Sequence, residues 1–364
     1  MPRIRFYISS HGFGHSTREI AVISEIPEWI DVDIVTSAPQ WLFQRSIKRR
    51  FHYQERRHDP GVVQFDCLHQ DVESTYRTWR DLLDQYPAMV AEEASRFDER
   101  EPSLIVGDIS PFATATAMAV HRPCVIIANF SWDWIFSALV KYNAKFQTII
   151  DRIAAYYRET TLLLRTPLSG DLSVFPHIED IPIIARRSNR SRLEARRGFG
   201  IEEHERVVLI SFGGHEFEHI PVDRLAAHAE ITFLTFNRRF AGPANVRFLD
   251  PYASYHPDAV RASDLVLTKM GYGIVTECIA HQTPMAYPPR EDFPEHDVLV
   301  RESRQYIPVL ELASEDFFSG RWLFLDTLFD RGEKIRAFSY PIANVHGAQK
   351  AAERLISILN ETVA

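Results

Sequence analysis

Short apolar runs alternate with stretches of helical periodicity in the first 165 residues of the chain. Strands are expected at 3–9, 32–36, 103–107, 124–128 and 162–164. Helices are expected between them, at 16–26, 71–100, 112–120 and 132–157. Strands separated by helices of this size predict a parallel sheet with helices on both faces.

Two local signals predict boundaries within these helices. Ser16 and Glu19 have the spacing of a capping box, which predicts that a helix begins at Ser16. Pro87 lies inside the long helical stretch, where its missing N–H predicts a break or a kink.

A change in composition separates this series from a second one. Residues 166–182 contain three prolines and little periodicity, which is typical of a linker. Further strands are expected at 206–212, 232–235, 246–249, 265–267 and 284–287, and further helices at 222–230, 272–280, 295–303 and 346–359. We therefore predict a first domain at 1–165 and a second at 166–364. The linker is 166–185, and the final helix, 346–360, is expected to pack back on the first domain.

Composition narrows the class of protein. The 364 residues carry a net charge of -8, which argues against a nucleic-acid polymer as partner. No apolar run is long enough to span a membrane, and the N-terminus has no signal-peptide pattern. Three cysteines without CxxC spacing disfavour disulfides and a cysteine zinc site. These features predict a cytoplasmic two-domain protein.

Arginine greatly outnumbers lysine, 35 to 6. The planar guanidinium suits phosphates and carboxylates, so the bias is compatible with an anionic ligand. Two basic clusters, at 45–50 and 186–197, are interpreted as solvated faces or linker segments without a catalytic role.

The loop at 11–15 (HGFGH) follows the first expected strand and precedes a helix. Its glycines allow close backbone approach to a ligand, and a helix start favours negative charge. A dinucleotide-binding loop would need a third glycine where Thr17 stands and an acid near Thr36, so a nicotinamide enzyme is disfavoured. His15 can instead serve as a general base, with His11 beside it.

Asp108 ends the expected strand at 103–107 in the same sheet. If the two strands are neighbours, Asp108 lies near His15 and can fix the tautomer of its ring. The alternative is an ordinary helix N-cap for the segment that follows.

Two loops of the second domain are candidates for binding phosphate. Residues 269–277 follow a strand and open a helix, so backbone N–H groups and Lys269 can bind phosphate, while Glu277 can accept from ribose hydroxyls. The loop 213–219 contains HExxH, but two glycines precede the motif and Pro221 follows it. Because zinc hydrolases carry HExxH on an unbroken helix, we favour a ligand-contacting loop. Glu291 and Asp292, after another strand, can bind sugar hydroxyls or cap the next helix.

Taken together, these loops resemble the glycosyltransferases of the GT-B fold, and the resemblance covers nearly the whole chain. It implies an α/β protein with two Rossmann-like domains facing each other across a cleft. Four segments, at 129–136, 181–201, 208–214 and 269–293, also resemble the glycosyltransferase-like N-terminal region of L-arabinokinases. The run FPEHD departs from the FNEEP-like run of that group, and a sugar-kinase domain is not expected in a chain of this length.

The resemblance implies transfer of a sugar from a nucleoside diphosphate sugar, with UDP-sugars favoured, to the hydroxyl of a small-molecule or glycan acceptor. His15 would be the base and Asp108 its orienting partner, and the reaction would invert configuration without a metal or other cofactor. The donor diphosphate and ribose would contact Gly213, Gly214, Lys269, Gly271, Tyr272, Gly273, Ile274 and Glu277. The donor sugar would contact Glu291 and Asp292. The cleft and acceptor side would comprise His11, Gly12, Phe13, Gly14, Trp132 and Asp133.

Two alternatives remain open at this point. A noncatalytic nucleotide-sugar-binding protein would keep the donor loops without using His15 as a base. A nucleotide-sugar 2-epimerase would share the fold and act without an acceptor.

Overall fold

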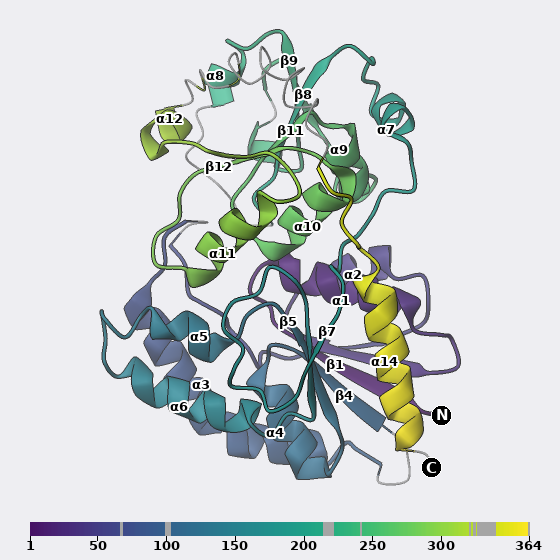
Figure 1. The fold of residues 1–364 in the computed structure, drawn as a ribbon, viewed down its shortest axis with the longest axis vertical. Coiled ribbons are helices and arrows are strands. Elements are labelled where there is room, and N and C mark those ends of the chain that lie inside the picture. Colours follow the sequence, from purple (N-terminus) through teal and green to yellow (C-terminus); the bar gives the residue numbers. More distant parts are fainter. Residues whose placement is uncertain are drawn as a thin grey trace.

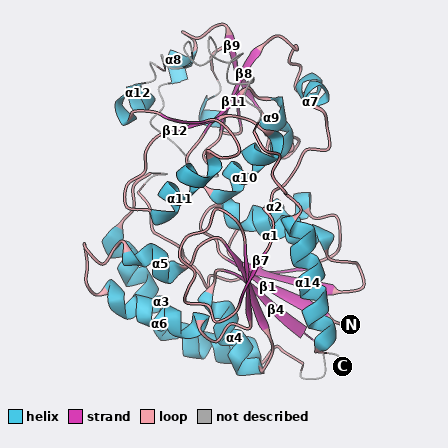
Figure 2. Cartoon of the chain, viewed as in Figure 1, coloured by secondary structure: helices cyan, strands magenta, loops and turns pink. Residues whose placement is uncertain are grey.

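The computed structural model describes residues 1–65, 68–98, 103–213, 222–240, 242–319, 322, 325 and 340–362. These residues form two α/β domains stacked end to end, each built on its own sheet (Figures 1 and 2). No helix in the described part of the chain is long and apolar enough to cross a membrane.

The first domain is a parallel sheet in the order β3-β2-β1-β4-β5-β6-β7. Its strands are β1 (Arg3–Ile8), β2 (Asp31–Thr36), β3 (His52–Glu55), β4 (Ser103–Asp108), β5 (Cys124–Ala128), β6 (Leu162–Arg165) and β7 (Ile178–Asp180). Its helices are α1 (Phe13–Glu25), α2 (Gln40–Ser46), α3 (Val72–Ala94), α4 (Pro111–Val120), α5 (Trp132–Ser137) and α6 (Phe146–Tyr157). Every residue of β4 and β5 is buried, because apolar cores cover both faces of the sheet.

The second domain is a parallel sheet in the order β10-β9-β8-β11-β12-β13. Its strands are β8 (Arg206–Ile210), β9 (Ile231–Thr235), β10 (Val246–Phe248), β11 (Leu265–Leu267), β12 (Met285–Tyr287) and β13 (Val309–Glu311). Its helices are α7 (Arg192–Gly198), α8 (Val222–Leu225), η1 (Arg238–Phe240), α9 (His256–Ala262), α10 (Tyr272–His281), α11 (Pro294–Ser303) and α12 (Ser314–Ser319). The predicted α/β class with two parallel-sheet domains is confirmed.

The last helix, α14 (Gly347–Glu361), returns to the first domain. Its apolar face, which includes Ala351, Leu355 and Leu359, joins the core that contains Ile4 and Ile23 of β1 and α1. Figure 1 shows this helix beside the sheet of the first domain, far along the molecule from β8 and β9. The chain therefore passes between the domains twice.

Several element boundaries differ from those expected. The helix α1 begins at Phe13 rather than at Ser16, and its N-cap is Gly12, so Ser16 and Glu19 form no capping box. The helix α3 runs unbroken through Pro87, because buried residues such as Trp79 and Leu83 before it and the partly buried Met89 and Val90 after it pack on the same core. The stretch 132–157 divides into α5 and α6, and β7 adds part of the expected linker to the first sheet.

Candidate functional site

The site lies where the first turns of α1 and α10 meet across the domain boundary. Gly12 precedes α1 with φ 72°, a backbone conformation that favours glycine, and Gly271 precedes α10. A Cβ on Gly273 would lie only 3.2 Å from the Cα of Gly14, so the two backbones are in near contact. Two helix N-termini, each with unpaired N–H groups, thus converge on one place.

A cavity of about 100 Å³ lies between these turns. All five residues of the 11–15 loop line it, as do Gly213, Lys269 and residues 271–274. The structure therefore brings the predicted base loop of the first domain and the predicted phosphate loop of the second domain to one cavity.

Asp108 lies beside His15 because β1 and β4 are neighbours. Ile8 pairs with Asp108 at the carboxyl ends of the two strands, and Asp108 Oδ2 lies 2.9 Å from His15 Nδ1. Burial pushes the pKa of Asp108 up, but Arg18 and then His15 outweigh burial and hold this pKa below its usual value. An ionised carboxylate at Nδ1 favours a proton on that nitrogen and leaves Nε2 as the basic one.

Arg18 extends this pair into a buried polar network that the sequence analysis missed. Its guanidinium contacts Asp108 Oδ1 and donates to Asn129 Oδ1 at 2.7 Å. Asn129 in turn donates to Glu295 Oε1 at 2.7 Å, so the network crosses to α11 of the second domain. Arg18 lies one turn after His15 on α1. This helical spacing is the only feature of the sequence that could have placed Arg18 in the network.

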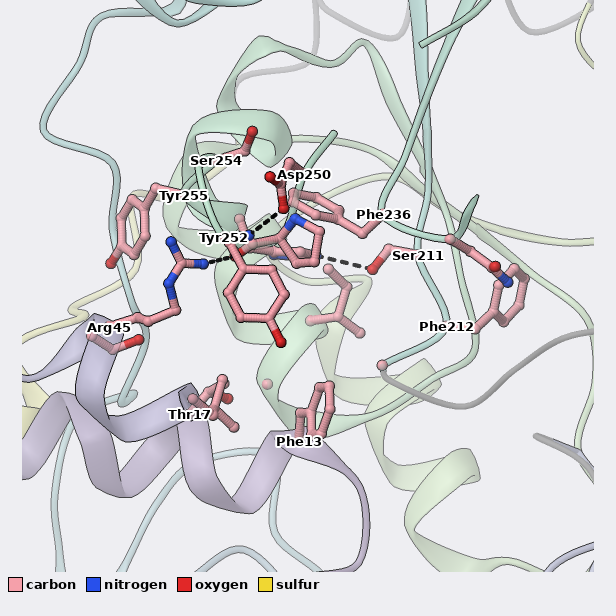
Figure 3. A pocket seen from close by; sticks show the side chains of 18 of the residues that line it. Phe13, Thr17, Arg45, Ser211, Phe212, Phe236, Asp250, Tyr252, Ser254 and Tyr255 are labelled. Atoms are coloured by element: carbon pink, nitrogen blue, oxygen red, sulfur yellow. Dashed lines mark hydrogen bonds between the residues drawn. The ribbon is translucent and has the colours of Figure 1, made fainter. Parts of the chain in front are cut away.

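A second cavity, of about 840 Å³, lies beside the first and shares the Phe13–Gly14 turn and Gly273 with it (Figure 3). Both domains line it. Thr17 and Arg45 come from the first domain, and Ser211, Phe236 and Tyr252 from the second. Arg45 donates to the carbonyl of Pro251 and stacks on Tyr252, with 4.9 Å from its guanidinium carbon to the ring centroid.

Glu277 lines this larger cavity, held by side chains from two other segments. Arg186 lies 2.6 Å from its Oε1, and His256 Nδ1 lies 2.7 Å from its Oε2. Burial alone would raise the pKa of Glu277, but Arg186 and His256 lower it to about 2. Arg186 belongs to a cluster interpreted as solvated, yet its side chain is only 12% exposed, so that interpretation is wrong for this residue.

Besides Asp108, four predicted site residues among those described line neither of these two cavities. Asp292, with φ 57°, is bound by Lys141 at 2.5 Å and by the Tyr142 hydroxyl on the outer surface, and Glu291 is exposed beside it. Trp132 is fully buried and donates to Asp59 at 2.7 Å. Asp133 is half-buried in the first turn of α5. The roles given to these four residues stay predictions.

Trp132 packs behind the 11–15 loop. Its ring centroid lies 5.6 Å from that of His11 and 6.4 Å from that of His15. Burial raises the pKa of its partner Asp59 to about 6, and the bond from Trp132 partly offsets this rise. Trp132 therefore supports the histidines from the core.

Gly214 and the HExxH motif at 215–219 lie outside the described residues. Among the residues that the structure does describe, no three His, Cys, Asp or Glu side chains are grouped so that they could hold a metal ion.

No protein-family model matches the chain. The chain is 29% identical over 322 residues to L-arabinokinase of Arabidopsis thaliana. The matched region covers 87% of this chain but only 31% of that protein. A UDP-glucosyltransferase from Polygonum tinctorium superposes with a TM-score of 0.62 at 14% identity, covering 99% of this chain and 98% of the other. The chain has the GT-B fold.

A second structure agrees with this assignment. UGT89C1 of Arabidopsis thaliana, solved with UDP, superposes with a TM-score of 0.59 at 14% identity over the whole of both chains. At such identities the likeness establishes the fold alone. The resemblance to GT-B glycosyltransferases and to L-arabinokinase inferred from the loops is confirmed.

Proposed function

We propose that this GT-B protein is a glycosyltransferase that moves a sugar from a nucleoside diphosphate sugar, with a UDP-sugar favoured, to an acceptor hydroxyl. The observation that carries the proposal is the position of His15. It lies 2.9 Å from an ionised Asp108 and lines the same cavity as the first turn of α10. A general base in one domain thus faces a phosphate-binding helix start in the other.

In the proposed reaction, His15 Nε2 takes the proton of the acceptor hydroxyl as its oxygen attacks the anomeric carbon. The bond from that carbon to the diphosphate oxygen breaks, and the electron pair leaves with the diphosphate. Asp108 stabilises the imidazolium that forms, and a single displacement inverts the configuration. Positioned general-base catalysis contributes about 10²–10⁴-fold in rate.

The departing diphosphate would be stabilised by the second domain. Lys269 and the first residues of α10 line the same cavity as His15, and their ammonium and backbone N–H groups would donate to the diphosphate. Such preorganised donors stabilise developing negative charge without a metal ion. Metal independence is therefore part of the proposal.

The test is a panel of sugar nucleotides incubated with and without candidate acceptor alcohols, with release of nucleoside diphosphate as the readout. We expect release that depends on an acceptor, that persists in EDTA, and that yields a glycoside of inverted configuration. Tight binding of a sugar nucleotide without turnover across a broad acceptor panel would instead favour a binding protein. Acceptor-independent inversion at C2 of the sugar would favour a 2-epimerase.

A further inference from the structure

Three polar side chains of the larger cavity form a continuous chain of contacts. Ser211, directly after β8, has its Oγ 2.9 Å from His256 Nε2 at the start of α9. The other ring nitrogen of His256 lies 2.7 Å from Glu277 Oε2 on α10. All three residues line the cavity, and Figure 3 shows the Ser211 hydroxyl directed across it along the drawn hydrogen bond.

The carboxylate fixes the tautomer of His256. Glu277 is 2% exposed, and its pKa of about 2 keeps it ionised near neutral pH. An ionised carboxylate only accepts hydrogen bonds, so Nδ1 of His256 carries a proton whenever Glu277 is ionised. The variable proton is therefore the one on Nε2, which faces Ser211.

The direction of the Ser211 hydroxyl proton depends on whether Nε2 of His256 is protonated. When Nε2 is bare, it accepts the Ser211 hydroxyl proton, and only lone pairs of Oγ face the cavity. When Nε2 is protonated, it donates to Oγ, and the hydroxyl proton of Ser211 is free to turn toward a ligand. Only the second state offers a donor to an anion.

Other charged groups surround His256. On its own helix, Asp258 accepts from Ser188 at 2.5 Å and lies 3.4 Å from Arg190. Arg186 is bound to Glu277, and the Phe236 ring lies 5.2 Å from the imidazole. Tyr255 precedes His256 in the chain, and Asp250 lines the same cavity. The direct contacts at the imidazole nitrogens are therefore Glu277 and Ser211.

The cavity is suited to an anion. Four arginines line it, Arg45, Arg186, Arg238 and Arg239, against the carboxylates Asp250 and Glu277. A Ser-His-carboxylate chain activates a serine nucleophile in hydrolases, but the surplus of cations favours a phosphate-bearing ligand over an ester.

We propose that the Ser211–His256–Glu277 chain binds the diphosphate of the donor and takes up one proton as it does so. No covalent bond changes: a solvent proton adds to His256 Nε2, which then donates to Ser211, and the Ser211 hydroxyl donates to a phosphate oxygen. The inference rests on the proposed function, because it takes a nucleoside diphosphate sugar as the ligand. It adds Ser211 to the residues that contact the donor and makes His256 the positioning residue behind Ser211.

The experiment is calorimetric titration with UDP-glucose and with GDP-mannose, in buffers of different ionisation enthalpy. Sugar nucleotides are used because, unlike free diphosphates, they lack a phosphate proton that titrates near neutral pH. We expect uptake of up to about one proton per ligand, and affinity that falls as the pH rises, by up to about tenfold per pH unit.

Two substitutions locate the proton. His256→Asn should abolish both the uptake and the pH dependence, while His204→Asn, in an exposed loop, should leave both unchanged. Ser211→Ala should weaken binding at low pH more than at high pH. Binding without proton uptake, or uptake that survives His256→Asn, would overturn this inference and leave the proposed function standing. Failure of every sugar nucleotide to bind wild-type protein at any pH would overturn both.

Discussion

Each domain holds one buried carboxylate between an arginine and a histidine. In the first domain Asp108 lies between Arg18 and His15, and in the second domain Glu277 lies between Arg186 and His256. Both carboxylates have a lowered pKa despite burial, because their partners outweigh the cost of desolvation. Each carboxylate therefore stays ionised and keeps a proton on Nδ1 of its histidine. Nε2 is then the nitrogen available for general-base chemistry in the first domain and for anion binding in the second.

The lowered pKa of Glu277 predicts an acid-sensitive contribution to stability. A carboxyl whose folded pKa lies below its unfolded value stabilises the fold above the unfolded pKa, and this stability is lost as pH falls through the folded pKa. Glu277→Gln should therefore lower the free energy of unfolding at pH 7 by about 3–5 kcal/mol, since it leaves Arg186 without its buried partner. The difference from wild type should shrink between pH 4.5 and about 2.

Chemical denaturation across this pH range is the measurement. Glu353→Gln, on the exposed face of α14, provides the control and should change little. A Glu277→Gln penalty that does not vary with pH would contradict the assignment of an ionised, paired Glu277.

The sequence could predict which side chains lie together only where the order of strands along the chain determines their positions. Asp108 could be placed near His15 because both follow parallel strands, and the carboxyl ends of neighbouring strands share one edge. Arg186 and His256 could not be assigned to Glu277, since they come from segments 91 and 21 residues away whose packing no periodicity specifies.

At the scale of elements, the starts of α1 and α10 determine the site. The helix α1 starts three residues before the capping signal at Ser16, so Phe13, Gly14 and His15 lie in its first turn. The spacing of Ser16 and Glu19 misled because Gly12, with its positive φ, turns the chain into the helix without a side-chain cap. This earlier start is what presents the N–H groups of α1 to the cavity.

The contact between the two helix starts predicts opposite effects of two Gly→Ala substitutions. A Cβ on Gly14 would meet Gly273 N at 3.7 Å, an ordinary contact, so Gly14→Ala should stabilise α1 by up to about 1 kcal/mol. A Cβ on Gly273 would lie 3.1 Å from Thr17 Oγ1 and 3.2 Å from Gly14 Cα. Because Thr17 is bonded to Gly14 O at 2.9 Å, neither neighbour can yield easily.

We therefore expect Gly273→Ala to melt several degrees below Gly14→Ala and to bind sugar nucleotides more weakly than wild type. Thermal unfolding and calorimetric titration of the two variants check this pair. Equal melting temperatures would show that the domains do not meet at these glycines.

At the scale of the whole molecule, the domains are joined by specific polar contacts as well as by the chain. Asn129 and Glu295 join the buried interiors at 2.7 Å, and Gln70 donates to the backbone of Asp292 at 2.9 Å near the surface. The alternation of strands and helices predicted two parallel sheets, because that pattern is local. It could not predict how closely the domains approach, which depends on side chains paired across more than 150 residues.

The proposed function gives the two domains different roles. The base belongs to the first domain, whereas the residues proposed to hold the donor diphosphate belong mainly to the second. Removing the base should therefore lower the rate of transfer and leave donor affinity unchanged. Loss of a purely structural histidine or of a donor-binding histidine would not give this result.

The most direct measurement compares His15→Ala with wild type for acceptor-dependent sugar transfer and, in parallel, for the dissociation constant of the same sugar nucleotide. His121→Ala, at the exposed end of α4, is the matched control. We predict a fall in kcat of about 10²–10⁴-fold for His15→Ala, with donor affinity close to that of wild type. Undiminished transfer by His15→Ala would contradict the account.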